Sequence, residues 1–190
     1  MTRIIGGEAG GRRIKAPSGV ATRPTSDRVR EALFSTVDAA LGSLHGLRFL
    51  DVYAGSGAVG LEARSRGAGV VTLVEHDRGT ARLIHENIET LGMSRVDVVV
   101  SPAARALAQT PKAPYDVVFL DPPYALPIAD VEIDLRSLVG HGWLAHEALV
   151  VVERSTRDDG PSWPAGLAGD RSRRYGETTL WYGHATVAAR

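Results

Sequence analysis

Four consecutive residues, Asp121-Pro122-Pro123-Tyr124, carry groups that can hold a flat amine. They follow the apolar run 117–120, which predicts a buried strand that ends here because proline cannot donate a main-chain hydrogen bond. The Asp121 carboxylate and the Pro122 carbonyl can accept hydrogen bonds, and the Tyr124 ring offers a face for stacking. Two such acceptors can aim the lone pair of an exocyclic nucleobase amine and stabilise the positive charge that grows as it attacks an electrophile. The segment therefore predicts chemistry at such an amine, although a proline pair can also simply end a strand.

A glycine-rich motif lies upstream. The apolar run 49–52 predicts a strand that leads into Ala54-Gly55-Ser56-Gly57 and then into a helix containing Gly60. The glycine spacing matches the G-x-G-x-x-G pattern of dinucleotide-binding loops. Two cofactor classes fit such a loop. Nicotinamide dinucleotides place a pyrophosphate on the helix N-terminus, whereas S-adenosylmethionine has no phosphate and carries an ammonium and a sulfonium.

Two carboxylates favour S-adenosylmethionine. Asp51 stands four residues before the first glycine, where it would repel a pyrophosphate and attract the cationic methionine end of the other cofactor. Glu75 follows the predicted strand 70–74, and its two oxygens can hold both hydroxyls of a ribose. The alternatives are that Asp51 is a solvated turn residue and that Glu75 is a surface charge.

Composition narrows the class of protein. A chain of 190 residues with 44% hydrophobic residues can build one full domain core. It has no cysteine, which excludes disulfides, thiolate nucleophiles and cysteine-based metal sites. The spacing of its six histidines indicates no metal site. We find neither a membrane-spanning apolar stretch nor a signal-like N-terminus, and we expect a cytoplasmic protein.

Charge is distributed unevenly along the chain. The net charge is zero, but residues 1–35 carry +4, from seven basic and three acidic side chains. A basic N-terminal arm on an acidic body is typical of a nucleic-acid contact confined to one face, although a solvated hairpin rich in arginine would show the same pattern.

The predicted elements would bring the candidate groups together. A hairpin is expected from segments 3–5 and 12–15 around a glycine-rich turn. A helix is expected to begin at Ser26 or Asp27. Its core face would consist of Val29, Leu33, Val37 and Leu41, while Arg28 and Arg30 would point elsewhere. Apolar runs at 49–52, 70–74, 96–100, 117–120 and 148–152 alternate with helical segments near 80–91, 103–108 and 128–138, and a hairpin of 170–175 and 178–182 ends the chain. This alternation predicts an α/β fold with a parallel sheet and helices on both faces, in which Asp51, Glu75 and Asp121 converge beyond the strand ends.

With these residues in view, the chain closely resembles the RsmD family of bacterial 16S rRNA guanine-N2 methyltransferases. The resemblance spans nearly the whole chain and rests on Arg3-Ile4-Ile5-Gly6-Gly7, the segment from Thr22 to Phe34, Ala54-Gly55-Ser56-Gly57, Leu61-Glu62-Ala63, Ser65-Arg66-Gly67-Ala68 and Asp121-Pro122-Pro123-Tyr124. It implies the class I methyltransferase fold, with a Rossmann-like, mostly parallel sheet of seven strands and a small N-terminal hairpin. It also implies S-adenosylmethionine as donor and 16S rRNA in an assembling 30S particle as substrate.

The resemblance further implies a division of the chain into an RNA-contacting hairpin and basic loop, residues 1–24, and a methyltransferase domain, residues 25–190. The expected RNA contacts are Arg3, Arg12, Arg13, Arg23, Thr25, Arg28 and Arg30. Arg23 could alternatively reach the cofactor carboxylate. We expect a monomer that needs neither a metal nor a membrane.

Two residues depart from the family pattern. Pro102 stands where the family commonly has an aspartate that accepts from the adenine amine, so that adenine would be held by main-chain groups and apolar walls near Ala103. Tyr53 replaces a usual phenylalanine. The expected cofactor-binding residues are Asp51, Tyr53, Ala54, Gly55, Ser56, Gly57, Glu75, His76 and Ala103.

The expected reaction is methyl transfer to a guanine that is flipped out, stacked on Tyr124 and held through its N2 amine by Asp121 and the Pro122 carbonyl. Three other functions fit part of the pattern. An N6-adenine DNA methyltransferase would share the Asp-Pro-Pro-Tyr chemistry. A nicotinamide-dependent dehydrogenase is disfavoured by Asp51, and an RNA-binding assembly factor without catalysis would keep only the basic arm.

Overall fold

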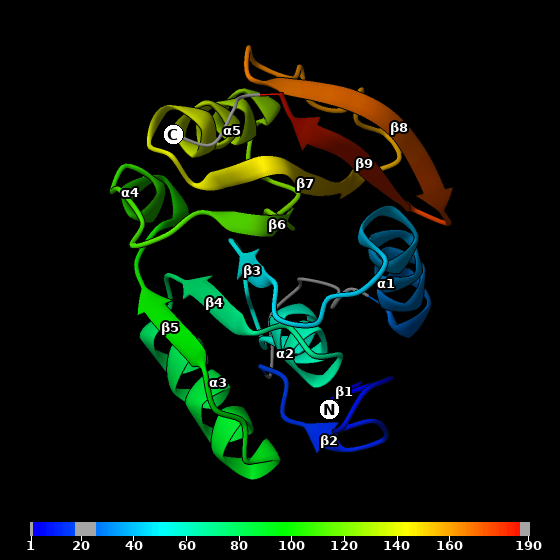
Figure 1. Cartoon of the computed structure of the whole chain (residues 1–190), viewed down its shortest axis with the longest axis vertical. Coiled ribbons are helices and arrows are strands. Elements are labelled where there is room, and N and C mark those ends of the chain that lie inside the picture. Colours follow the sequence, from blue (N-terminus) through cyan, green and yellow to red (C-terminus); the bar gives the residue numbers. More distant parts are fainter. Residues whose placement is uncertain (1, 18–25, 187–190) are drawn as a thin grey trace. The chain divides into compact units, whose positions relative to one another are not determined.

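A computed structural model describes residues 2–17 and 26–186 (Figure 1). The chain divides into two compact units, Met1–Ser101 and Pro102–Arg190. Strands β5, β4 and β3 of the main sheet belong to the first unit, and β6, β7, β9 and β8 belong to the second. The predicted α/β class, with seven mostly parallel strands and a separate N-terminal hairpin, is confirmed.

The first unit holds the hairpin and three parallel strands. Its elements are β1 (Thr2–Arg3), β2 (Arg13–Ile14), α1 (Asp27–Leu41), β3 (Arg48–Asp51), α2 (Ala58–Ser65), β4 (Val70–Glu75), α3 (Arg78–Leu91) and β5 (Val96–Val100). β4 pairs with β3 on one side and β5 on the other, and its Val71 and Leu73 are fully buried. β5 is an edge strand, and its Val99 and Val100 are exposed.

Local capping explains where the helices of this unit begin and end. The Ser26 hydroxyl accepts from the Val29 amide, 3.3 Å away, and so starts α1 at the predicted position. Asp77 caps α3 by accepting from the Thr80 amide at 2.7 Å, and this hydrogen bond lowers the pKa of Asp77. Gly92 ends α3 with a φ of 65°, which favours glycine.

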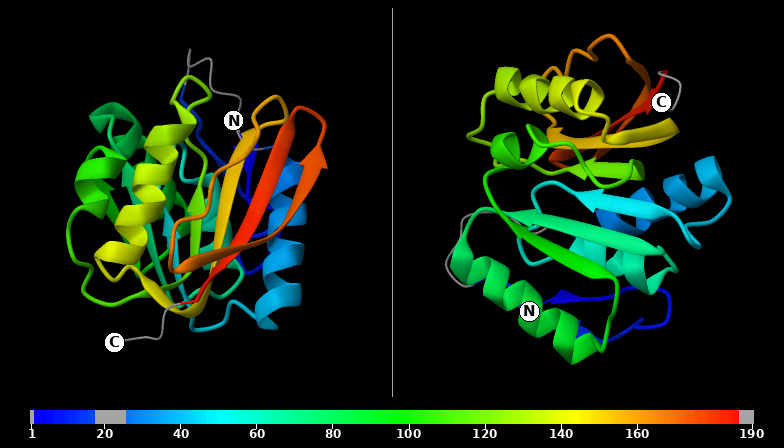
Figure 2. Two further views of the ribbon diagram at one scale, coloured as in Figure 1. Left: turned by 90° about the horizontal axis from the view of Figure 1, so that it is seen from above. Right: turned by 60° about the vertical axis from the view of Figure 1, so that its left-hand side comes forward.

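The second unit contains α4 (Ala103–Leu107), β6 (Tyr115–Leu120), α5 (Ile128–Gly140), β7 (Leu144–Ser155), β8 (Leu167–Tyr175) and β9 (Thr178–Ala185). β6 and β7 are parallel, whereas β9 pairs antiparallel with β7 and β8 (Figure 2). The predicted terminal hairpin is confirmed, with longer strands. β7 also extends beyond the predicted run 148–152, because its pairing with β9 continues through Glu153, Arg154 and Ser155.

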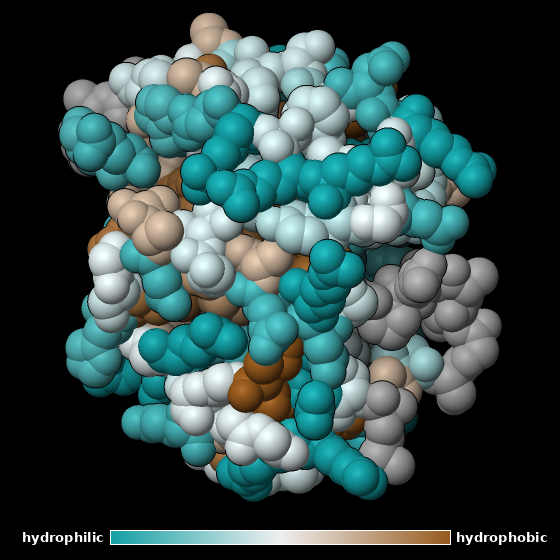
Figure 3. All heavy atoms as spheres, turned by 90° about the vertical axis from the view of Figure 1, so that its right-hand side faces the viewer, coloured by the Kyte–Doolittle hydropathy of each residue, from teal (hydrophilic) through white to brown (hydrophobic). Residues whose placement is uncertain are grey.

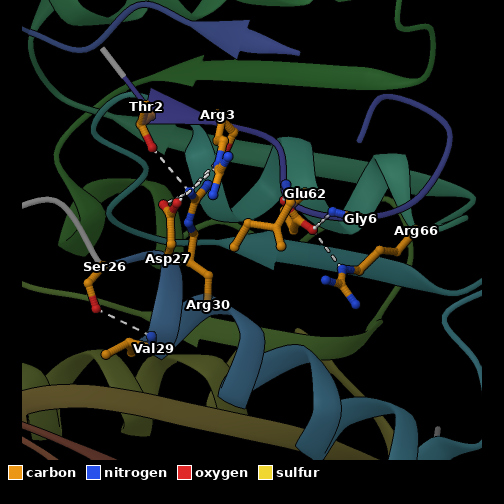
Figure 4. Close-up of polar contacts among 10 residues, drawn as sticks. Thr2, Arg3, Gly6, Ser26, Asp27, Val29, Arg30, Glu62 and Arg66 are labelled. Carbon is orange, nitrogen blue, oxygen red and sulfur yellow. Dashed lines mark hydrogen bonds and ion pairs between the residues drawn. The ribbon is translucent and has the colours of Figure 1, made fainter. Parts of the chain in front are cut away.

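Arg30 differs from the sequence expectation. Its side chain is fully buried, so the expectation that it points away from the core is wrong. One guanidinium nitrogen, Nη2, donates to Arg3 O at 2.8 Å and to Thr2 Oγ1 at 3.1 Å, and pairs with Asp27 Oδ1 at 2.7 Å (Figure 4). Arg30 therefore fastens the first strand of the hairpin to the start of α1.

Figure 3 shows one face that is mostly hydrophilic, with a small apolar patch. The large apolar side chains exposed within the described residues are Val99, Val100, Tyr124 and Ile133. None of the helices that the structure describes has the length and apolar character to cross a membrane.

Close packing of α2 on β4 yields a stability prediction. A Cβ at Gly60 would lie 2.1 Å from Leu73 Cδ2 and 3.1 Å from Val71 Cγ1, and both side chains are fully buried. We expect Gly60→Ala to lower the free energy of unfolding by about 1–3 kcal/mol, because the core has no room for the added methyl group. Gly140→Ala is the control, since Gly140 ends α5 with open space around it. Equal urea midpoints for the Gly60 variant and the parent would contradict this packing.

The contacts of Asp27 predict a pH effect. The hydrogen bond from Arg30, assisted by Arg3 and partly opposed by burial, lowers the pKa of Asp27 below 3.8. A lowered pKa in the folded state means that this stabilisation is fully present above the pKa of the unfolded chain and is lost as the pH falls through the lowered value. Urea unfolding from about pH 6 to about pH 2 should therefore show a gap in unfolding free energy between the parent and Asp27→Asn that closes at the acid end. A gap independent of pH would exclude a contribution from the charge.

Candidate functional site

The glycine loop joins β3 to α2 in the first unit. The Ala54 amide donates to Val74 O at 2.9 Å, and the Gly57 amide donates to Ala54 O at 2.7 Å. Gly55 and Gly57 have φ angles of 54° and 79°, which side chains with a Cβ rarely adopt. The loop is therefore a tight turn anchored to β4.

Asp51 closes β3 and is almost completely buried, with 1% of its surface exposed. Its Oδ2 accepts from the Gly60 amide at 3.1 Å, in the first turn of α2. The alternative that Asp51 is solvated is wrong. A pyrophosphate would have to bind at the same helix N-terminus, where the carboxylate now stands, so this contact argues against a nicotinamide dinucleotide.

Glu75 closes β4 and is also buried, so the alternative of a surface charge is wrong. Its Oε2 accepts from the Gly55 amide at 3.0 Å, and its Oε1 accepts from the Asp77 amide at 2.8 Å. A carboxylate offers about four lone-pair sites, so each oxygen keeps acceptor capacity for a ribose hydroxyl. Glu75 thus shapes the loop and fits the predicted ribose contact.

The other expected cofactor residues lie in different settings. Tyr53 and Ser56 are half-buried in the loop, and His76 is exposed with its Nδ1 3.2 Å from Glu75 Oε1. Ala103 belongs to the second unit, where it is the first residue of α4. Pro102 occupies the N-cap position of α4 and provides no side-chain cap.

The Asp-Pro-Pro-Tyr segment forms a corner after β6 in the second unit. Asp121 is half-buried and Pro122 is buried, while Pro123 is exposed. The Tyr124 ring is 50% exposed, and its hydroxyl lies 3.5 Å from Thr178 Oγ1 at the start of β9. Tyr124 is therefore exposed enough for a stacking partner to reach it.

Arg154, which the sequence did not single out, holds this corner from β7. Its side chain is 3% exposed, and its Nε lies 2.8 Å from Asp158 Oδ2. Its Nη1 donates to Pro123 O at 3.3 Å and its Nη2 donates to Leu126 O at 3.0 Å. The Leu126 amide also donates to Pro123 O, at 2.8 Å. The only available signal was an arginine two residues beyond the predicted strand 148–152.

A hollow of about 370 Å³ adjoins the corner. Its walls come from residues 124–128, from Arg154 and from residues 157–160. Tyr124 forms part of the wall, whereas Asp121 does not. The hollow carries both Arg157 and Asp159, so it suits a polar group with donors and acceptors more than a simple anion.

The expected RNA contacts are not equivalent. Arg3 pairs with Asp27 at 3.3 Å, and Arg12 donates to the carbonyls of Thr90 and Leu91 at the end of α3. Arg13 and Arg28 are exposed, whereas Arg30 is buried. Arg23 and Thr25 lie outside the described residues. Arg3 and Arg12 are exposed and have internal partners, and Arg13 and Arg28 are exposed cations as well.

Helix α2 holds the hairpin through the side chains of Glu62 and Ser65, and Figure 4 shows Glu62 with Gly6 and Arg66. Glu62 is fully buried, and its two oxygens accept from the Ile5 amide at 2.7 Å and the Gly6 amide at 2.8 Å. Arg66 Nε lies 2.7 Å from the same carboxylate. Ser65 Oγ accepts from the Ala9 amide at 2.9 Å. The sequence shows the motif Leu61-Glu62-Ala63, but nothing in it indicated that Glu62 binds the main chain of the hairpin.

Comparisons with known proteins agree with these features. The family described as "Conserved hypothetical protein 95" matches residues 2–184. "Ribosomal RNA small subunit methyltransferase D" of Escherichia coli K12 is 40% identical over 175 residues, covering 92% of this chain and 85% of that protein. The protein of the same name from Haemophilus influenzae is 38% identical over 162 residues, covering 84% of this chain and 80% of that one.

A solved structure is also similar over nearly its whole length. The structure described as "Putative methyltransferase yhhF from Escherichia coli" has a TM-score of 0.86 and 36% identity, with 98% of each chain covered. The sequence match to the family extends from the hairpin through the glycine loop and the Asp-Pro-Pro-Tyr corner to β9. This chain therefore belongs to the family described as Conserved hypothetical protein 95, to which the resemblance to RsmD proteins pointed.

Proposed function

We propose that this chain transfers a methyl group from S-adenosylmethionine to the exocyclic N2 amine of one guanine in 16S rRNA. The observation that carries the proposal is the Asp-Pro-Pro-Tyr corner, held by the buried Arg154 with a half-exposed tyrosine at its end. The relatives that are named ribosomal RNA small subunit methyltransferase D support rRNA as the substrate class.

The glycine loop and its two carboxylates fit the donor. Asp51 occupies the helix N-terminus that a pyrophosphate would need, and Glu75 keeps acceptor capacity beside the loop. When bound, S-adenosylmethionine supplies an activated methyl group next to a cationic sulfur. The loop residues 53–57 with Glu75 and His76 would hold it, and Ala103 would contribute an apolar wall to the adenine.

The corner fits the acceptor. A guanine amine is a poor nucleophile because its lone pair is delocalised into the ring. Asp121 and the Pro122 carbonyl would accept its two N–H groups, while Tyr124 stacks on the base. Pro123 O already accepts from Arg154 and Leu126, which is why Pro122 is assigned this role. Asp121 stabilises the charge that develops on nitrogen and need not be a strong base, because the amine becomes acidic only as it is methylated.

The RNA would be held in part by the N-terminal arm, residues 1–24, and by the start of α1, with the exposed Arg13 and Arg28 as phosphate contacts. Arg30 is better explained as a support of the arm, since it is buried. Action as a monomer on an assembling 30S particle in the cytoplasm belongs to the same proposal.

Transfer of labelled methyl groups tests this function. Naked 16S rRNA, 30S subunits and DNA are each incubated with the protein and labelled S-adenosylmethionine, and the nucleosides are then separated. We expect N2-methylguanosine from one of the RNA substrates. N6-methyladenine in DNA would instead identify a DNA methyltransferase, and binding of RNA without any labelled product would identify an assembly factor without catalysis.

Removal of the Asp121 carboxylate separates chemistry from cofactor binding. We expect Asp121→Ala to lower kcat by about a hundred- to a thousandfold, as for the loss of one preorganised group that stabilises charge in a transition state. Its affinity for S-adenosylhomocysteine, measured by calorimetry, should stay close to that of the parent. A variant that turns over normally but binds the cofactor poorly would contradict the role given to Asp121.

Removal of Arg154 tests whether the corner must be held rigid. Arg154→Met should lower the free energy of unfolding by about 1–3 kcal/mol, since it removes a donor from two part-buried hydrogen bonds and leaves Asp158 without this ionic partner. It should also lower kcat at least about tenfold, because a misplaced acceptor loses alignment with the amine. Arg157→Met is the matched control, as it removes an exposed charge from the same hollow. Equal kcat losses in the two variants would show that charge alone matters.

A further inference from the structure

Asn87, on α3, makes three hydrogen bonds with its amide. The residue is 1% exposed. Its Oδ1 accepts from the Lys15 amide at 2.8 Å, and its Nδ2 donates to Lys15 O at 2.9 Å and to Ser56 O at 3.2 Å. The opposite orientation of the side chain would bring two N–H donors together at Lys15, so the network fixes which atom is oxygen. The Asn87 side chain thus donates to the main chain of two separate segments, at Lys15 and at Ser56.

The two segments belong to different parts of the proposed reaction. Ser56 lies between Gly55 and Gly57 in the glycine loop, where the donor would bind. Lys15 directly follows β2 and leads toward the stretch that contains Arg23 and Thr25. The hairpin runs beside α3 in Figure 2, in agreement with the bonds of Arg12 and Lys15 to that helix. Asn87 is therefore a direct link between the RNA arm and the cofactor loop.

The other bonds that hold the arm end on helices. Glu62 and Ser65 bind hairpin amides from α2, and Arg12 binds the carbonyls at the end of α3. Lys15 Nζ also pairs with Glu86 at 2.8 Å, at an exposed position. None of these bonds, among the residues that the structure describes, continues to a main-chain group of the glycine loop. These bonds attach the arm to α2 and α3, whereas the Asn87 amide also binds the main chain of the glycine loop.

We propose that Asn87 is a positioning residue that couples binding of the methyl donor to binding of RNA. This inference rests on the proposed function. A donor bound against the glycine loop adds to the bonds that already hold this loop and further restrains the Ser56 carbonyl. This carbonyl accepts from the Asn87 amide, which in turn binds the main chain of Lys15. The arm then loses less conformational entropy when it binds RNA. Linkage requires the effect to be reciprocal, so that RNA raises the affinity for the donor by the same factor.

Calorimetry measures this coupling. S-adenosylhomocysteine replaces the donor so that no turnover occurs, and it is titrated with and without excess naked 16S rRNA transcript. We expect RNA to raise its affinity about two- to tenfold in the parent, the range that one net hydrogen bond can carry. In Asn87→Ala the ratio should fall to about one. Ser65→Ala is the matched control, because it loosens the hairpin without touching the loop, and it should keep the parent's ratio.

Several outcomes would overturn the inference. They are a parent ratio of about one with both ligands binding, an Asn87 variant that retains the ratio, or a Ser65 variant that loses it equally. These results differ from a failure of the proposed function, in which S-adenosylhomocysteine or RNA would not bind the parent, or no methyl group would be transferred.

Hydrogen exchange gives a second readout in the unmodified protein, without RNA. Addition of S-adenosylhomocysteine should slow exchange of the Lys15 amide, because Asn87 then accepts from it more persistently. The Ile4 amide, which donates to Arg12 O inside the hairpin at 2.9 Å, should exchange at an unchanged rate. A specific link would be contradicted if the ligand left the exchange rate of the Lys15 amide unchanged, or if it slowed the Lys15 and Ile4 amides equally.

Discussion

Several buried charged side chains among the described residues bind main-chain groups, and this constraint shapes the loops on which the proposed chemistry depends. Removing a charge from water is costly unless hydrogen bonds replace the lost hydration. Asp51 and Glu75 meet that requirement with amides of the glycine loop and its neighbours, and Glu62 meets it with two amides of the hairpin. Arg154 does the same with two carbonyls at the Asp-Pro-Pro-Tyr corner. Each loop is thereby held by a buried charged group that would lose hydrogen bonds if the loop moved away from it.

Such an arrangement suits transfer of a small group. The proposed reaction needs acceptors whose positions change little as charge develops, because reorganisation at that moment would raise the barrier. A loop held only by its own turn would move too freely. Here the corner after β6 is held from β7 by Arg154, and the loop after β3 is held from β4 by Glu75. Neighbouring strands therefore supply the rigidity that the loops lack.

Local signals made the order of elements predictable. The valine-rich runs of β4 and β6 and the helical spacing of α1 are properties of short segments, and the structure reproduces them. Segment ends were harder to predict, since β7 continues through polar residues only because β9 pairs with it. The roles of Arg30 and Arg154 could not be predicted, because their main-chain partners lie 27 to 31 residues away along the chain. The expectation that Arg30 points away from the core is wrong for the same reason.

The edge position of β5 bears on the behaviour of the protein at high concentration. Val99 and Val100 are exposed there, and Asp97 is the one charged residue within Val96–Val100. An apolar edge strand is a template for pairing with a second copy, and a negative charge on it opposes such pairing because two carboxylates would meet. Resistance of this chain to self-association along that edge therefore depends on a single carboxylate.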